Sequence, residues 1–317
     1  MRTPEHDRAP GRTAEGREDQ VDAGSSTSLP SAGDKARLNW PAILALAVPL
    51  VEQETVLVGV PPSLRRVHYL LVSSPAAVAL GYANTLNCYK TLSRKTTQAR
   101  DLDAFPQLID QTRTVEYSSG WTSAKAMIQA LASSYSLNRE QHLDVQVVLI
   151  AEKAGVVPLL TSRYRWLPVT ASRGYVSVSH ARKIAALVSP DREAVGIYVG
   201  DYDPTGLDID RALGERLPFP LRRVALTADQ IAEHRLPPAP AKATDSRTRR
   251  MEAEQGAAMQ VEIDALPSAE LFATIDAALS EHAGVSVRAD GTPDWPDVDA
   301  VEAEQRRWLR DLAAGAR

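Results

Sequence analysis

VQVVLIAEK, residues 145–153, is the most informative part of the sequence, because it joins a short apolar run to an acidic end. A second run of the same kind, AVGIYV at 194–199, leads into GDYDPTG at 200–206. Both runs are rich in β-branched residues and apolar nearly throughout, which is typical of strands covered on both faces in a parallel sheet. Sequence of helical character follows each run. We therefore predict an α/β fold built on a parallel sheet with helices on both faces.

Acidic residues stand where both predicted strands end. Side chains alternate in an extended chain, so Asp201 and Asp203 point the same way and can share one cation. Ligand sites of open α/β sheets lie outside the carboxyl ends of the strands, where Glu152 would supply a further ligand or act as an acid or base. Mg²⁺ prefers such oxygen ligands, and Gly206 would let the backbone approach a phosphate. The alternative is an Asp-rich loop that only caps a helix.

Two motifs in these positions resemble those of a Toprim domain: Glu152-Lys153 after the first strand and DYDPTGLDI, residues 201–209, after the second. More narrowly, they are similar to the catalytic A subunit of type IIB topoisomerases (topoisomerase VI) and the related meiotic double-strand-break protein. The chain looks like a stand-alone bacterial or phage-type member. The resemblance implies Mg²⁺ held by Glu152, Asp201 and Asp203, double-stranded DNA as substrate, and a homodimer. Full strand passage would require a separate ATPase (B-type) subunit.

The segment SLRRVHY at 63–69 predicts a short helix whose two sides differ in chemistry. Ser63 is suited to cap its start, and Leu64, Val67 and Leu71 share one apolar face with His68 at its edge. Tyr69 falls well off that face, between Arg65 and Arg66. If this helix reaches DNA, the arginines would hold a phosphate and favour the phenolate form of the tyrosine, which eases attack on phosphorus. The alternative is a surface tyrosine beside solubilising arginines.

The same segment is similar to the Ser/Thr-Leu-Arg-x-x-Tyr-Tyr pattern of the winged-helix domain in the resembled family. Tyr69 stands in the place of the second, catalytic tyrosine, and His68 replaces the first. The resemblance implies that Tyr69 attacks a backbone phosphate and forms a phosphotyrosyl link, with Arg65 and Glu152 as further catalytic residues. The metal would neutralise the phosphate and assist the leaving 3′-oxygen.

Residues 55–100 carry six Lys or Arg and no Asp or Glu, although the whole chain has a net charge of −4. This local absence of acids indicates a DNA-facing surface. A helix predicted over 84–100 places basic side chains on its outer face, which fits a winged-helix reader of DNA. The predicted DNA-contacting residues are Arg66, Lys90, Arg94 and, from similarity to the Gly-Tyr segment of the family, Arg173.

The rest of the sequence gives the organisation of the chain. The single Cys88 excludes an intrachain disulfide and indicates a cytoplasmic, here nucleoid-associated, protein. The apolar run at 40–51 is too short to span a bilayer and predicts a buried helix. The predicted parts are a disordered leader without a signal peptide (1–38), the winged-helix domain (39–118), a connector (119–143), the Toprim domain (144–284) and a charged C-terminal tail (285–317).

The predicted function is Mg²⁺-dependent DNA strand cleavage by a topoisomerase VI A-like protein. Two alternatives remain open. One is a hydrolytic Toprim nuclease, in which the same carboxylates activate water and no covalent intermediate forms. The other is a winged-helix DNA-binding protein without catalysis. A flavodoxin-like nucleotide enzyme is disfavoured, because no Gly-rich phosphate loop follows a strand.

Overall fold

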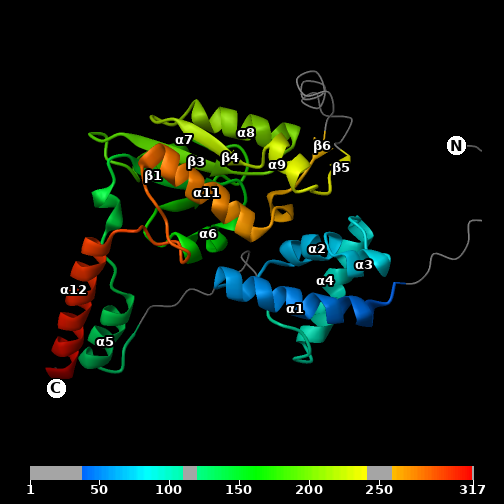
Figure 1. Cartoon of the computed structure of the whole chain (residues 1–317), viewed down its shortest axis with the longest axis horizontal. Coiled ribbons are helices and arrows are strands. Elements are labelled where there is room, and N and C mark those ends of the chain that lie inside the picture. The colour runs from blue at the N-terminus through cyan, green and yellow to red at the C-terminus, as the bar shows by residue number, and fades with distance from the viewer. Residues whose placement is uncertain (1–37, 110–119, 241–258, 316–317) are drawn as a thin grey trace, which may run out of the picture. The chain divides into compact units, whose positions relative to one another are not determined.

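The computed structural model describes residues 38–109, 120–240 and 259–315. Its main sheet has four strands in the order β2-β1-β3-β4, and every neighbouring pair is parallel (Figure 1). The predicted α/β class and parallel sheet are thus confirmed. All but the last residue of the predicted leader lies outside the described residues. The strands are β1 (Gln146–Ala151), β2 (Val169–Ala171), β3 (Ala194–Val199) and β4 (Leu221–Ala225).

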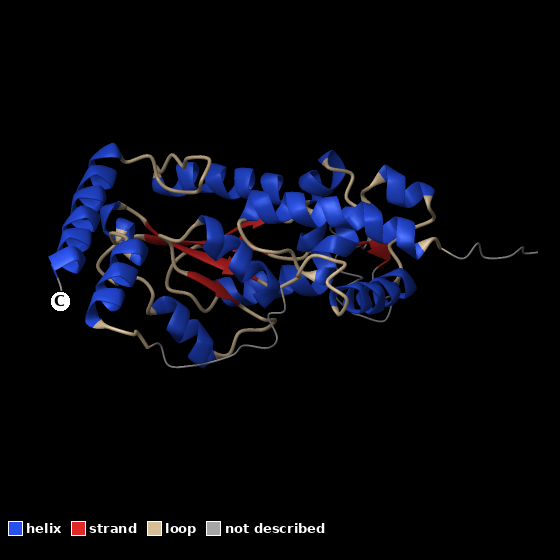
Figure 2. Ribbon diagram, turned by 90° about the horizontal axis from the view of Figure 1, so that it is seen from below, coloured by secondary structure: helices blue, strands red, loops and turns tan. Residues whose placement is uncertain are grey.

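Alternation of side chains along β1 divides its apolar residues between the two faces of the sheet. Val147 and Leu149 belong to one buried cluster, and Val148 and Ile150 to another. Helices therefore cover both faces, as predicted, and the strands form an inner layer (Figure 2). The first cluster includes residues of α6 (Val157–Arg163) and α11 (Ser268–Ala283), and the second includes residues of α7 (Val178–Ala185) and α8 (Pro204–Gly214).

The segment 38–109 contains helices and no strand, and it encloses an apolar core of its own. The predicted cap is confirmed, because the Ser63 hydroxyl accepts a hydrogen bond from the Arg66 backbone N–H at 3.1 Å. Residues 38–109, the described part of the predicted winged-helix domain, thus form a helical module and include no strand of a wing; residues 110–118 lie outside the described residues. Its helices are α1 (Trp40–Val58), α2 (Leu64–Val72), α3 (Pro75–Ala79) and α4 (Leu86–Arg100).

α1 is longer than the sequence pattern predicted. It continues to Val58, so by length and composition it could cross a membrane, and the expectation of a helix too short for this was wrong. However, Ile43, Ala47 and Val51 recur every fourth residue and are fully buried among the other helices of the module. One face of α1 is therefore buried, as predicted, whereas Val56 and Leu57 near its end are exposed.

A short segment near the C-terminal part of the chain approaches the end of β3. β5 (Ala239–Pro240) pairs with β6 (Met259–Gln260), and Val261 then bridges to Tyr202, just after β3. The two backbone hydrogen bonds of that bridge measure 2.9 and 3.0 Å. Residues 261–265 are thereby fixed beside the acidic strand end.

The predicted connector and tail each contribute a helix, and the two pack against each other (Figures 1 and 2). Arg139, which follows the connector helix, is buried and pairs with Asp299 and Glu302 of the tail helix at 2.8 and 3.0 Å. The remaining elements are α5 (Ala124–Ser134), α9 (Ala228–Glu233), α12 (Pro296–Gly315) and the short 3₁₀ turns η1 (Arg139–His142), η2 (Ala154–Val156) and η3 (Ile263–Ala265).

Candidate functional site

The acidic residues at the ends of β1 and β3 lie together. Register pairing sets Ala151 opposite Val199, so Glu152 and Asp201 follow at the same edge of the sheet. The Glu152 Oε2 atom accepts a hydrogen bond from the Asp201 backbone N–H at 3.0 Å. Adjacent parallel strands therefore place the first two predicted site residues in contact.

Two glycines make room for this contact. A Cβ atom on Gly200 would lie 2.8 Å from Glu152 Oε2, and one on Gly206 would lie 2.5 Å from the Asp201 carbonyl oxygen. Both positions would have to shift to accept a side chain. The structure thus gives Gly206 a role in packing the acidic residues, where the sequence had suggested an approach to phosphate.

Asp201 and Asp203 differ in their surroundings. Asp201 is buried, and its Oδ1 atom accepts the Ile263 backbone N–H at 2.9 Å. Its Oδ2 atom lies 2.8 Å from Lys153 Nζ. Asp203 caps α8, because its Oδ1 atom accepts the Gly206 N–H at 2.6 Å. The capping role raised as an alternative therefore applies to Asp203 and not to Asp201.

Sequence reasoning missed two further acids. Glu262 and Asp264 follow the bridge to Tyr202, and their carboxylates lie 3.4 and 3.5 Å from Lys153 Nζ. The Glu-x-Asp spacing of 262–264 was the available signal, but no strand end with known partners was predicted there. We use the name carboxylate cluster for Glu152, Asp201, Asp203, Glu262 and Asp264.

Burial and mutual repulsion change the proton affinity of this cluster. Burial, followed by the neighbouring Asp201 and Asp203 charges, raises the pKa of Glu152 to about 7. Burial also raises the pKa of Asp201, although Lys153 opposes this. The Asp201, Asp264 and Glu262 charges outweigh burial and raise the pKa of Lys153, which stays cationic. One ammonium group thus balances part of a crowded set of carboxylates.

Replacing Glu152 by glutamine is expected to stabilise the metal-free protein at pH 8. The usual pKa of 4.5 applies to the unfolded chain, and the folded value is about 7. The contribution of Glu152 to stability is therefore complete below pH 4.5 and is lost as the pH rises through 7. We expect a gain on the order of 2 kcal/mol in the free energy of unfolding at pH 8. Urea unfolding in EDTA at pH 8 and at pH 4.5 measures it, and an equal effect at both values would contradict the shift.

Tyr69 is more buried than the sequence indicated. It is off the apolar face of α2, as expected, but only 8% of its surface is exposed. It packs with the apolar cluster of the sheet and not with the core of the helical module. Burial and the Glu262 charge raise the pKa of Tyr69, and Arg65 opposes them only in part. Arg65 alone favours the phenolate, as expected, but burial and the acids of the carboxylate cluster outweigh its effect on the pKa of Tyr69.

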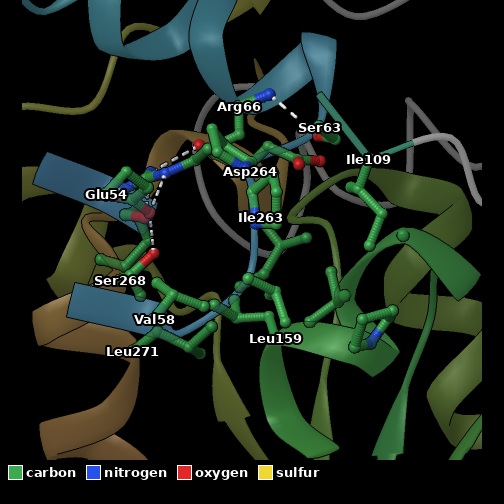
Figure 3. A pocket seen from close by; sticks show the side chains of 17 residues that line it. Glu54, Val58, Ser63, Arg66, Ile109, Leu159, Ile263, Asp264, Ser268 and Leu271 are labelled. Carbon is green, nitrogen blue, oxygen red and sulfur yellow. Dashed lines mark hydrogen bonds and ion pairs between the residues drawn. The ribbon is translucent and has the colours of Figure 1, made fainter. Parts of the chain in front are cut away.

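The two arginines of α2 are held by acids of the chain itself. Arg65 Nη1 lies 2.5 Å from Glu262 Oε2. Arg66 is buried, and its guanidinium binds the Glu54 carboxylate at 2.8 Å and the Leu266 carbonyl oxygen at 2.7 Å (Figure 3). The predicted DNA contact of Arg66 is therefore corrected, since its side chain is used inside the protein.

Figure 3 also shows the cavity beside this arginine, where α1 and α2 meet residues of the sheet-containing part. It encloses about 40 Å³ and is lined mainly by apolar side chains such as Val58, Leu159 and Leu271. Glu54 accepts a further hydrogen bond from the Ser268 hydroxyl at its wall. A space of this size excludes a nucleotide, so we treat the cavity as part of the packing between the helices and the sheet.

The other predicted DNA-contacting residues are exposed. Lys90 and Arg94 are four residues apart on the outer face of α4, as the pattern predicted. Arg173 is exposed beside the carboxylate cluster, and its backbone N–H donates to the Glu152 carbonyl oxygen at 2.9 Å. These three side chains are available to a polyanion.

The donor set around Glu152 consists of carboxylate oxygens, which is the chemistry that Mg²⁺ requires. Among the residues that the structure describes, however, no three His, Cys, Asp or Glu side chains are arranged as a ready-made metal site. Lys153 occupies one oxygen of Asp201. The residues fit an ion held by one or two carboxylates together with water or phosphate oxygens, and the predicted three-carboxylate site is not preformed.

Comparisons of this chain with family models, with curated proteins and with solved structures give no match.

Proposed function

We propose that this chain cleaves DNA in a Mg²⁺-dependent reaction at the carboxylate cluster. The observation that carries the proposal is the contact between Glu152 and Asp201 at the carboxyl ends of two adjacent parallel strands, with Asp203 next to it. Bound Mg²⁺ would supply charge neutralisation and polarisation of the phosphate. Glu152 and Asp203 would hold the ion, and Asp201 would divide its negative charge between the ion and Lys153. This extends the resemblance to a Toprim domain into a chemical role for each residue.

Hydrolysis is the version of this reaction that the geometry supports best. A nucleophilic tyrosine needs a base or a lowered pKa, and Tyr69 has a raised pKa with acids as its nearest charges. Water needs no such preparation by Tyr69. Attack by Tyr69 is the second candidate, favoured by one observation: its ring lines the same hollow as Arg65 and Glu262, at the edge of the carboxylate cluster.

DNA would approach over the exposed cations. Lys90 and Arg94 present two charges on α4, and Arg173 presents one beside Glu152. Contacts of this kind position a duplex through its phosphates and give no sequence preference. The proposed homodimer would bring two clusters to one duplex and yield double-strand breaks. A monomer would yield nicks. A separate ATPase subunit belongs only to a strand-passage version of the proposal.

Supercoiled plasmid DNA incubated with Mg²⁺, followed by detergent and gel electrophoresis, tests the proposal and separates its versions. We expect nicked or linear DNA with free ends, and we expect Tyr69→Phe to keep cleavage within about threefold of wild type, since water is the nucleophile. Protein-linked DNA that disappears in Tyr69→Phe would establish the covalent version instead. If the protein binds DNA but does not cleave it with any metal ion, it is a DNA-binding protein without catalysis.

A further inference from the structure

A hollow of about 430 Å³ opens beside the carboxylate cluster, between α2, the start of α4 and residues 260–262. We call it the aromatic hollow. Its size falls in the range of small-molecule sites, roughly 300 to 1,000 Å³. Its lining includes Arg65, Tyr69, Asn84, Leu86, Tyr89 and Glu262.

One wall of the aromatic hollow is an aromatic and apolar platform. Leu86 and Tyr89 are three residues apart on α4 and therefore share one face of that helix. Leu86 is 67% exposed, so its side chain is available to a ligand in the hollow. The Tyr89 ring is held by His68, which meets it edge-on at 5.4 Å between centroids. Arg65 lies 6.0 Å from the centroid of the same ring.

His68 is itself fixed, so the platform is rigid. Its Nδ1 atom lies 2.7 Å from the Tyr82 hydroxyl, and its Nε2 atom lies 3.2 Å from Asn84 Oδ1. Burial lowers the pKa of His68, which keeps the ring neutral. A neutral, hydrogen-bonded imidazole orients Tyr89 without adding charge. A planar ligand could therefore pack against Tyr89 and Leu86 with little rearrangement of the protein.

The other wall offers hydrogen-bonding groups. Tyr69 is 8% exposed, and its side chain lines the hollow. Glu262 uses Oε2 for both Arg65 and Lys153, and no described residue occupies its Oε1 atom. The wall thus presents a phenol donor and a carboxylate acceptor close to an aromatic platform.

We infer that the aromatic hollow binds a single unpaired DNA base, and that it takes bases carrying an exocyclic amine in preference to thymine. The base would stack on Tyr89 and Leu86, donate from its amine to Glu262 and accept from the Tyr69 hydroxyl. Adenine and cytosine have such a donor beside a ring acceptor on one edge, whereas thymine has no amine. Enzymes that act on nucleic acid often hold an extruded base in this way, between stacking side chains and polar groups.

The identity of the ligand as DNA rests on the proposed function, since Glu262 belongs both to the carboxylate cluster and to the aromatic hollow. A base seated there would place its own strand beside Glu152 and Asp201. A phosphate is disfavoured as the occupant of the hollow, because Glu262 and Asp264 would repel it. The inference gives Tyr69 a task as a hydrogen-bond donor, which its raised pKa suits.

Binding of labelled single strands in EDTA tests this inference without any cleavage. The probes are dA, dC, dT and abasic strands of about twelve nucleotides, followed by fluorescence anisotropy. We expect dA and dC to bind about tenfold more tightly than the abasic strand, and Leu86→Ala and Tyr89→Ala to lose most of that difference. Tyr69→Phe should reduce the preference for dC over dT, because only the contact to Glu262 then distinguishes them, and should leave abasic binding unchanged. Val78→Ala, at another exposed apolar residue, in α3, is the control.

Several outcomes would overturn the inference. Equal binding of dC and abasic strands by the wild-type protein would do so, as would unchanged preferences in Leu86→Ala, whose exposed side chain is not needed for folding. Competition by free dCMP at the concentration of the oligonucleotide would show a site for nucleotides and not for DNA. Base-dependent binding without cleavage by Mg²⁺ would refute the proposed function alone, and cleavage with base-independent binding would refute the hollow alone.

Discussion

Asp201→Asn is expected to lower the rate of Mg²⁺-dependent DNA cleavage by at least about a hundredfold, because metal assistance amounts to several kcal/mol of transition-state stabilisation. Asp201 contacts every part of the site: its N–H binds Glu152, its Oδ1 binds Ile263 and its Oδ2 binds Lys153. Asparagine can keep the first two bonds but removes the negative charge. Lys153 then loses its nearest partner and repels an incoming cation. The rate of loss of supercoiled plasmid measures the effect.

Asp191→Asn is the matched control for this substitution. Asp191 is an exposed aspartate that precedes β3, at the end of the strand opposite to Asp201. The Asp191→Asn protein should cleave DNA at the wild-type rate. Thermal unfolding of both variants shows whether any loss of activity reflects loss of folded protein. An Asp201→Asn protein that is folded and cleaves within threefold of the control would refute the proposed role of the carboxylate cluster.

The strands and their acidic ends were predictable because their signals are local. A run such as 194–199 is apolar whichever partner covers it, and the chain must turn where Asp203 and Pro204 begin a helix. Parallel pairing then forces Glu152 and Asp201 to one edge of the sheet. No long-range information was needed for this part of the site.

The surroundings of Tyr69 were not predictable in the same way. The periodicity of α2 reveals one buried face, formed by Val67 and Leu71, which packs within the helical module. The opposite side is covered by residues distant in sequence, including Glu262 and the apolar cluster of the sheet. The sequence of α2 alone suggests that a tyrosine between two arginines is exposed. It is buried only because residues from other parts of the chain pack against this side of the helix.

The same limitation explains why the sequence did not predict the ion pair between Glu54 and Arg66. Glu54 lies beyond the apolar run 40–51 from which the first helix was predicted, and Arg66 was expected to face DNA, yet each side chain is about nine-tenths buried. Arg66 also donates to the backbone carbonyl oxygens of Asp264 and Leu266 at 2.9 and 2.7 Å. This ion pair thereby connects the helical module to the segment that carries two acids of the carboxylate cluster.

Glu54→Ala is accordingly expected to be the most destabilising single change proposed for this chain. It leaves the buried Arg66 guanidinium without its counter-ion, which typically costs about 3–5 kcal/mol in the free energy of unfolding. Glu52→Ala, two residues earlier at an exposed position of α1, should change it by less than about 0.5 kcal/mol. Urea unfolding of the two variants and the wild type at pH 7 gives both values.

The double variant Glu54→Ala/Arg66→Met decides what the ion pair does. If the loss in Glu54→Ala comes from an uncompensated buried charge, removing that charge as well should recover much of the stability. The guanidinium bonds to residues 264 and 266 are still absent in the double variant. DNA cleavage should therefore remain below wild type even where stability recovers, because Glu262 and Asp264 are less firmly placed. Wild-type cleavage by a stable double variant would show that these two acids need no support from α2.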